Sequence, residues 1–158
     1  MSSSFIYIGI VFGGKSEEHE VSIESARTVV QSLESEKNSK RFKPICLYID
    51  KNGCWWPPSI ANSILKDKAS NTKDLINLPL SSKGFQGFPI ETQKVAIWFP
   101  VLHGPYGEDG SIQGFFKLTG KPFIGSGVLA SAIGMDKLRM KETFASAGLP
   151  QLPYISAN

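Results

Sequence analysis

The sequence has few of the features that mark specialised protein classes, and cysteine is the scarcest. It holds two cysteines in 158 residues, Cys46 and Cys54, which show neither a CxxC pattern nor the spacing of metal ligands. A disulfide framework or a zinc site is therefore not expected. We expect both cysteines to be reduced packing residues on or beside a strand.

Long apolar runs and a strong charge of one sign are also missing. No stretch approaches the roughly 18 apolar residues that a membrane span needs, and residues 1–4 lack the basic start and cleavage site of a signal peptide. The formal net charge is +3, with only a loose basic cluster at 37–43. These absences predict a cytoplasmic protein without a membrane or nucleic-acid partner.

The remaining composition is that of one globular domain. Hydrophobic residues make up 41% of the chain and charged residues 20%, which is enough to bury one core. There is no internal repeat and no low-complexity tract. Four apolar runs predict strands at about 5–12, 43–50, 94–102 and 122–125. Their continuous apolar character favours a parallel sheet covered on both faces.

Helices are expected in the crossovers between these strands. Apolar residues recur at steps of three and four in two segments. They are Ile23, Ala26, Val30 and Leu33 in the first, and Ile112, Phe115, Phe116 and Leu118 in the second. A third helix is predicted over about 136–147, closed by Gly148. The fold class predicted is an open, three-layer α/β domain, Rossmann-like, with a mainly parallel sheet and helices on both faces.

Two further segments carry weaker signals. An Asn-Gly pair at 52–53, flanked by apolar residues, predicts a β-hairpin after the second strand. The stretch 60–92 mixes polar residues with scattered leucines and is interpreted as a surface excursion.

The first glycine motif follows the first strand directly. Gly13 and Gly14 precede the predicted start of a helix, where Glu17, Glu18 and Glu20 crowd the first turn. A glycine pair lets the backbone approach a ligand, and the helix start offers free N–H groups. The carboxylates either complement the helix dipole or include one that binds an amine. The residues alone favour the first interpretation.

The second glycine motif follows the third strand and runs over 103–114, from His103 through Tyr106 to the next helix. In an open α/β sheet, ligands bind beyond the carboxyl ends of the strands, where both motifs are expected to lie. Asp109 is equally well explained as the N-cap of the following helix. A lone histidine is more often structural than catalytic, and that reading stays open for His103.

Together with the segments 122–127 and 135–137, these motifs resemble the D-alanine–D-alanine ligase family over about residues 5–150. The resemblance implies an ATP-grasp enzyme that uses ATP and Mg²⁺ to join two molecules of D-alanine for peptidoglycan synthesis. It also implies a homodimer that pairs through this domain. The ligands for magnesium and most of those for ATP would lie outside this sequence.

The resemblance also implies roles for individual residues. Glu18 would be the catalytic carboxylate that holds the ammonium of the first D-alanine. His103, Ser22 and Tyr106 would complete the substrate pocket, His103 by contacting the carboxylate or phosphate and Ser22 by bonding nearby backbone or Glu18. Glu20 would support the helix start from beneath.

Other residues of the motifs carry weaker expectations. Glu108, Gly110 and Gln113 match a loop that shapes the pocket. His19 is expected to be an exposed histidine on a helix face. Lys137 matches a lysine that reaches an ATP phosphate, although a solvated helix lysine is the better description for this chain alone.

The segment 125–127 lacks a phosphate-binding pattern and is interpreted as a tight strand-to-helix turn. The expected division is an N-terminal substrate-side domain over residues 1–133, followed over 134–158 by the first helix and lead-in of a truncated central ATP-grasp domain. The chain alone is then expected to be inactive.

Two alternatives remain open. The chain could be a stand-alone, non-catalytic α/β module that binds a small amino acid or packs against a partner, and an exposed apolar patch would argue against it. A Rossmann dehydrogenase is a more distant alternative, because its glycine fingerprint is missing. Within the ligase class, D-lactate or D-serine could replace the second D-alanine.

Overall fold

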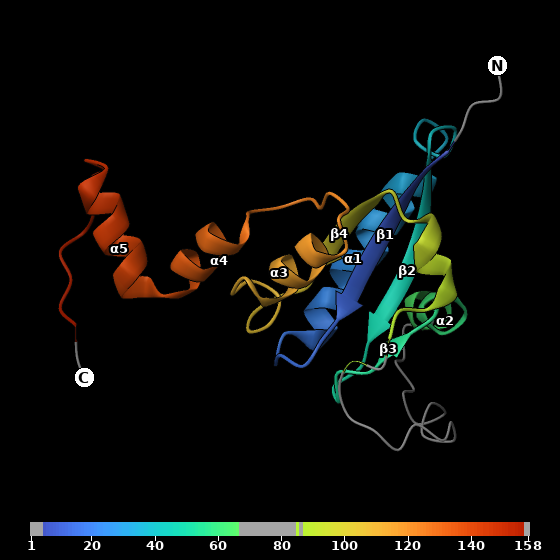
Figure 1. Cartoon of the computed structure of the whole chain (residues 1–158), viewed down its shortest axis with the longest axis horizontal. Coiled ribbons are helices and arrows are strands. Elements are labelled where there is room, and N and C mark those ends of the chain that lie inside the picture. The colour runs from blue at the N-terminus through green and yellow to red at the C-terminus, as the bar shows by residue number, and fades with distance from the viewer. Residues whose placement is uncertain (1–4, 67–84, 86, 157–158) are drawn as a thin grey trace.

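The computed structural model describes residues 5–66, 85 and 87–156, and its centre is a four-stranded sheet. The strands are β1 (Ile6–Gly13), β2 (Phe42–Ile49), β3 (Trp55–Trp56) and β4 (Ile97–Val101), in the order β3-β2-β1-β4 (Figure 1). β1 pairs in parallel with β2 and β4, and the short β3 pairs antiparallel with β2. The predicted open, mainly parallel sheet is confirmed.

The register of the parallel strands brings their carboxyl ends together. Gly13 pairs with Ile49 across β1 and β2, and Phe12 pairs with Val101 across β1 and β4. The segments that leave these strands therefore begin side by side at one edge of the sheet. Both glycine motifs lie at that edge.

Helices cover both faces of this sheet. They are α1 (His19–Glu34), α2 (Pro58–Lys66), α3 (Ser111–Leu118), α4 (Val128–Met135) and α5 (Lys137–Ser146), with a 3₁₀ helix, η2 (Ile90–Lys94). α1 and α2 pack on one face, and α3 packs on the other. α4 and α5 extend away from the sheet (Figure 1).

Alternation along the strands separates the core into two halves, because successive side chains point to opposite faces. Even-numbered residues of β1 and β2 face α1 and α2: Ile8, Ile10, Phe12, Cys46 and Tyr48. Odd-numbered residues face α3: Val11, Ile45, Leu47 and Ile49. This burial on both faces accounts for the continuous apolar runs in the sequence.

Both cysteines are buried, which agrees with their interpretation as packing residues. Burial, with a smaller effect of the Glu34 carboxylate, raises the pKa of the Cys46 thiol to about 12.

The third and fourth predicted strands needed correction. β4 begins at Ile97 and not at 94, because Ile90–Lys94 forms the 3₁₀ helix η2 that leads into it. The strand expected at 122–125 is reduced to one parallel bridge between Trp98 and Phe123.

The interpretation of 60–92 as a surface excursion was wrong for its described ends. α2 forms over Pro58–Lys66 and buries Ala61 and Ile64 against β2 and α1. At the other end, Phe85 and Phe88 pack edge-on against Trp55, at ring-centroid distances of 5.7 and 5.6 Å. Residues 67–84 and 86 lie outside the described part of the chain.

Leu118 was wrongly expected in the buried stripe of its helix. Ile112 and Phe116 are buried, whereas Leu118 is 88% exposed. Two residues after Phe116, a helix has turned through about 200°, so Leu118 lies on the opposite face.

The hairpin and the last helix are confirmed. Asp50 organises the hairpin turn, because its Oδ1 accepts hydrogen bonds from the amides of Asn52 and Cys54. α5 ends at Ser146, two residues before Gly148, whose φ of 73° suits a glycine after a helix. Within the described residues, every helix is too short or too polar to cross a membrane.

The close packing of β1 on β4 yields a first prediction. A Cβ at Gly9 would lie 2.6 Å from Trp98 Cε3 and 2.9 Å from Val95 Cγ1, so Gly9→Ala should lower the free energy of unfolding by about 1–3 kcal/mol. Urea unfolding measures this. Gly134→Ala is the matched control, because Gly134 lies within α4 with nothing near its Cβ position, and alanine favours helix by about 1 kcal/mol. Equal stability of the two variants would contradict the prediction.

Candidate functional site

The Ser22 hydroxyl joins three elements at the carboxyl edge of the sheet. Its Oγ accepts a hydrogen bond from the Gly13 amide at 2.8 Å and donates one to the Val101 carbonyl. Ser22 is completely buried in α1, so the ends of β1 and β4 are fixed against this helix. The expected bonding of Ser22 to backbone is present.

Glu18 stands at the N-cap position of α1, at the end of the turn that leaves β1. Its carboxylate makes no capping hydrogen bond to the described residues of the helix. The side chain is exposed and lies against the other motif: a Cβ at Gly104 would come within 2.9 Å of Glu18 Oε2. With φ of 68°, Gly104 also has a conformation that suits glycine.

Ser16 and Ser25 connect the two glycine motifs. Ser16 Oγ donates to the His103 carbonyl at 2.7 Å and accepts from the Glu18 amide at 3.3 Å. In α1, one turn after Ser22, the Ser25 hydroxyl lies 3.2 Å from His103 Nε2. The structure therefore brings Glu18 and His103 together, as the fold prediction required.

The loop after β4 is held by its own carboxylates. Glu108 Oε2 accepts from the Gly104 amide at 2.8 Å. Asp109 accepts from the amides of Tyr106 and Ser111, both at 2.9 Å. The N-cap of α3 is Gly110, so the assignment of that position to Asp109 was one residue early.

Gln113 closes the same loop from within α3. Its Nε2 donates to the Gly107 carbonyl at 2.8 Å, and the side chain is buried. Its Oε1 finds no hydrogen-bond partner among the described residues.

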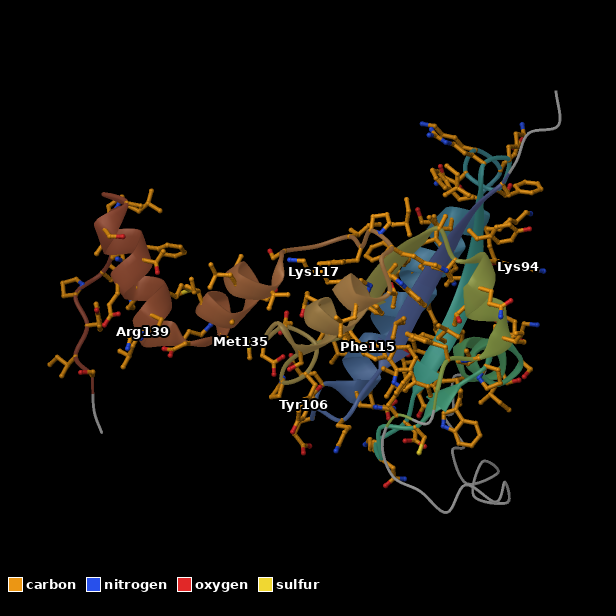
Figure 2. The ribbon with its side chains drawn as sticks, viewed as in Figure 1. Lys94, Tyr106, Phe115, Lys117, Met135 and Arg139 are labelled. Atoms are coloured by element: carbon orange, nitrogen blue, oxygen red, sulfur yellow. The ribbon has the colours of Figure 1, made fainter. Side chains whose placement is uncertain are left out.

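Tyr106 lies exposed at the tip of this loop (Figure 2). Its φ of 68° is unusual for a residue with a side chain, and the hydrogen bond to Asp109 holds this conformation. The Lys15 ammonium sits 5.7 Å from the centroid of its ring. Tyr106 therefore lies beside the turn after β1.

A cleft of about 250 Å³ opens between the two loops on the α3 side of the sheet edge. Its lining includes Gly14, Lys15, His103 and Tyr106 from the two loops, together with the aromatic residues Trp55 and Phe115. Of the four predicted substrate residues, His103 and Tyr106 line this cleft, whereas Glu18 and Ser22 lie on the α1 side.

Lys137 is separate from this edge. It is the first residue of α5, after an N-cap formed by Asp136, whose Oδ1 accepts from the amides of Leu138 and Arg139. Figure 2 labels Arg139, two residues after Lys137 in α5, and it lies well away from Tyr106. The phosphate-binding role of Lys137 stays a prediction.

His19 was wrongly expected on an exposed helix face. It is 1% exposed, its Nδ1 lies 2.5 Å from the Gly14 carbonyl, and its Nε2 lies 3.0 Å from the Tyr48 hydroxyl. Its place follows from helical spacing, because His19, Ser22, Ile23 and Ala26 form one buried stripe. Extending the apolar pattern back by one turn would have found it.

Two ionisable groups at this edge have altered acidity. Burial, reinforced by the carboxylates of Asp50 and Glu20, raises the pKa of the Tyr48 phenol well above its usual range, so the hydroxyl stays protonated. Partial burial alone would raise the pKa of Asp109, but the hydrogen bonds from Ser111 and Tyr106 outweigh it and lower that pKa.

An open α/β sheet of this kind belongs to a class of domains in which ligands, where they bind, lie at the carboxyl edge of the strands. Comparison with known proteins makes this specific. The family model described as D-ala D-ala ligase N-terminus matches residues 7–126. The chain therefore belongs to the family of D-alanine–D-alanine ligase N-terminal domains.

Similar sequences carry the same name. The D-alanine–D-alanine ligase of Synechococcus sp. (strain CC9311) is 54% identical over 158 residues, and that of Prochlorococcus marinus (strain MIT 9303) is 52% identical over 158 residues. Each alignment covers 100% of this chain and 45% of the relative. The chain thus spans a little under half the length of these curated relatives.

Solved structures show the same fold. The D-alanine–D-alanine ligase from Coxiella burnetii superposes with a TM-score of 0.71 at 26% identity, over 92% of this chain and 42% of that one. The VanG D-Ala:D-Ser ligase from Enterococcus faecalis gives 0.69 at 31% identity, over 92% of this chain and 43% of that one.

The lowered pKa of Asp109 yields a second prediction. Asp109→Ala removes two amide hydrogen bonds and should cost about 1–2 kcal/mol of unfolding free energy at neutral pH. The folded state favours the charged carboxylate of Asp109. Its contribution to the free energy of unfolding is therefore complete above the ordinary pKa of an aspartate, and is lost as the pH falls through the lowered pKa of the folded state.

Urea unfolding at a series of pH values measures the difference between the variant and the wild type. Glu36→Ala is the control, because the Glu36 side chain is 95% exposed. A difference for Asp109→Ala that stayed constant down to strong acid would show that the carboxylate charge does not contribute.

Proposed function

We propose that the chain is the substrate-side domain of an ATP-dependent ligase that joins two molecules of D-alanine for peptidoglycan synthesis. The observation that carries the proposal is the position of the Glu18 carboxylate. This carboxylate makes no capping hydrogen bond to the described residues of α1, and it lies at the sheet edge beside Gly104 and the His103 loop. The chain belongs to the D-alanine–D-alanine ligase N-terminal family.

Glu18 is the residue that would hold the ammonium of the first D-alanine. Its position at the helix start supplies a carboxylate without using it to close the helix. A charge-assisted hydrogen bond would then fix the amino acid so that its own carboxylate points to the reacting phosphate.

His103 would contact the far end of the same substrate. Its imidazole Nε2 lies 3.2 Å from the Ser25 hydroxyl, and the residue lines the cleft. A histidine there can donate to a carboxylate or a phosphate. Tyr106 would shape the entrance, and Ser22, being buried with its hydroxyl engaged twice, would position the two loops and not touch the substrate.

The reaction proceeds in two steps. Phosphoryl transfer from ATP converts the first D-alanine's carboxylate into an acyl phosphate and releases ADP. The amine of the second D-alanine then attacks the carbonyl carbon, forms the peptide bond, loses a proton and expels phosphate. In this scheme the domain binds and orients the first substrate.

The described residues do not fit a magnesium site. Among them, no group of three or more histidine, cysteine, aspartate or glutamate side chains is arranged to hold a metal ion. We therefore assign no step of the reaction in this domain to magnesium. The proposed contact of Lys137 with an ATP phosphate rests on the resemblance alone.

Exposed apolar side chains on α4, on α5 and in the segment after them are evidence that this domain packs against further domains. Leu129 is 74% exposed, Leu152 82% and Ile155 96%. Such a concentration marks a contact surface, and we propose that the remaining domains of the ligase cover it. This favours the ligase over a stand-alone binding module, and supports a domain boundary near residues 133–134.

The finer assignments are also proposals. We place the protein in the cytoplasm, where ATP is available, and expect a homodimer that pairs through this domain. D-Alanine is the proposed acceptor. Because one structural neighbour is named as a D-Ala:D-Ser ligase, kinetics with D-alanine, D-serine and D-lactate must decide between acceptors.

The overall proposal is tested by D-alanine-dependent release of phosphate from ATP and Mg²⁺. The protein encoded by the complete reading frame should be active, and the 158-residue chain should not be. If the longer protein formed no ADP when D-alanine was added, the ligase assignment would fail.

The role of Glu18 is tested in that longer protein by Glu18→Gln. Loss of the charge should raise the KM for the first D-alanine by about ten- to a hundredfold, with little effect on the melting temperature because the side chain is exposed. Steady-state kinetics over a wide range of D-alanine separates the two sites. Glu17→Gln, an exposed neighbour, is the control, and an unchanged first KM for Glu18→Gln would remove Glu18 from the site.

A further inference from the structure

The buried His19–Tyr48 pair lies directly beneath the turn that carries Glu18. His19 is the first residue of α1, and Tyr48 comes from the carboxyl end of β2. Their rings meet edge to face, with centroids 5.5 Å apart and planes at 78°. His19 is 1% exposed and Tyr48 is completely buried. This buried polar pair has no role in the function proposed so far.

The hydrogen bonds define the tautomer of His19. A carbonyl oxygen only accepts, so the short contact of 2.5 Å to Gly14 requires a proton on Nδ1. In the neutral ring, Nε2 is then an acceptor, and the Tyr48 hydroxyl donates to it at 3.0 Å. Tyr48 can serve as this donor because its phenol stays protonated.

This pair closes the Gly14–His19 turn. The imidazole bridges from the start of α1 back to the carbonyl of Gly14, and the Gly14 amide donates to the Ile49 carbonyl at the end of β2. The turn is therefore anchored to β2 at two points, through Ile49 and through Tyr48. Glu18 is the residue immediately before His19, so its backbone has little freedom while this anchor is in place.

We infer that His19, in the tautomer protonated at Nδ1 and oriented by the Tyr48 hydroxyl, is a positioning residue for the Glu18 carboxylate. It acts through the turn and does not touch the substrate. This inference rests on the proposed function of Glu18. It predicts that a change far below the surface alters the binding of the first D-alanine and leaves the second unaffected.

Three variants of the full-length ligase test the inference. Tyr48→Phe removes one oxygen and leaves the ring, so the first-site KM should rise about three- to tenfold, the energy of one hydrogen bond. His19→Leu removes both hydrogen bonds and should raise it more than tenfold. His19→Asn places an amide donor near the position of Nδ1 but does not replace the contact with Tyr48, so it should bring the KM back to about the level of Tyr48→Phe.

Controls separate positioning from general loss of stability. Tyr7→Phe removes a hydroxyl from a half-buried tyrosine on the opposite face of the same sheet, and should leave both KM values unchanged. The KM of the second D-alanine is an internal control in every variant. Melting temperatures show whether each variant is folded at the assay temperature, and Tyr48→Phe is small enough to keep the test valid if His19→Leu does not fold.

The outcomes are distinct. A rise in the first KM alone, with rescue by asparagine, supports the inference. Lower melting temperatures with an unchanged first KM, or asparagine behaving like leucine, would overturn it and leave His19 with a purely structural role. A wild-type protein without D-alanine-dependent activity would instead refute the proposed function.

Discussion

One buried hydroxyl group fixes the geometry on which the rest of this domain depends. Ser22 Oγ pairs with the last amide of β1 and the last carbonyl of β4, so three elements meet at a single oxygen atom. Without it, a buried N–H and a buried C=O would each lose a partner, at a cost of about 1–3 kcal/mol per group. Both glycine loops start from these two backbone groups, and their separation follows from this constraint.

The site at that edge has two sides of different character. Glu18 lies exposed on the α1 side, whereas Trp55 and Phe115 form an apolar wall on the α3 side. An ion pair with an exposed carboxylate contributes only about 0–1 kcal/mol, so Glu18 in this open domain would hold an ammonium weakly. Strong binding requires a further surface that excludes water from the carboxylate, because charges attract more strongly at low dielectric.

The sequence predicted what depends on local pattern, and missed what depends on packing between elements. Continuous apolar runs gave β1 and β2, and glycine spacing located both loops. The burial of His19 was missed because a histidine carries no apolar signal, although its helical spacing from Ile23 places it on the buried stripe. Its partners, Gly14 and Tyr48, could not be predicted because they come from two different strand ends. The roles of Glu18 and Lys137 came from resemblance, since residue spacing alone does not distinguish a binding carboxylate from a helix-capping one.

The two buried thiols give the domain an internal reporter of its own opening. With a pKa of about 12, the Cys46 thiol holds almost no thiolate at neutral pH, and the thiolate is the form that reacts. Cys46 lies in the middle of β2 and Cys54 in the adjoining hairpin, so a thiol reagent reaches them only when this half of the sheet separates from α1 and α2. The rate of labelling in native buffer would then measure how often the β2 side opens.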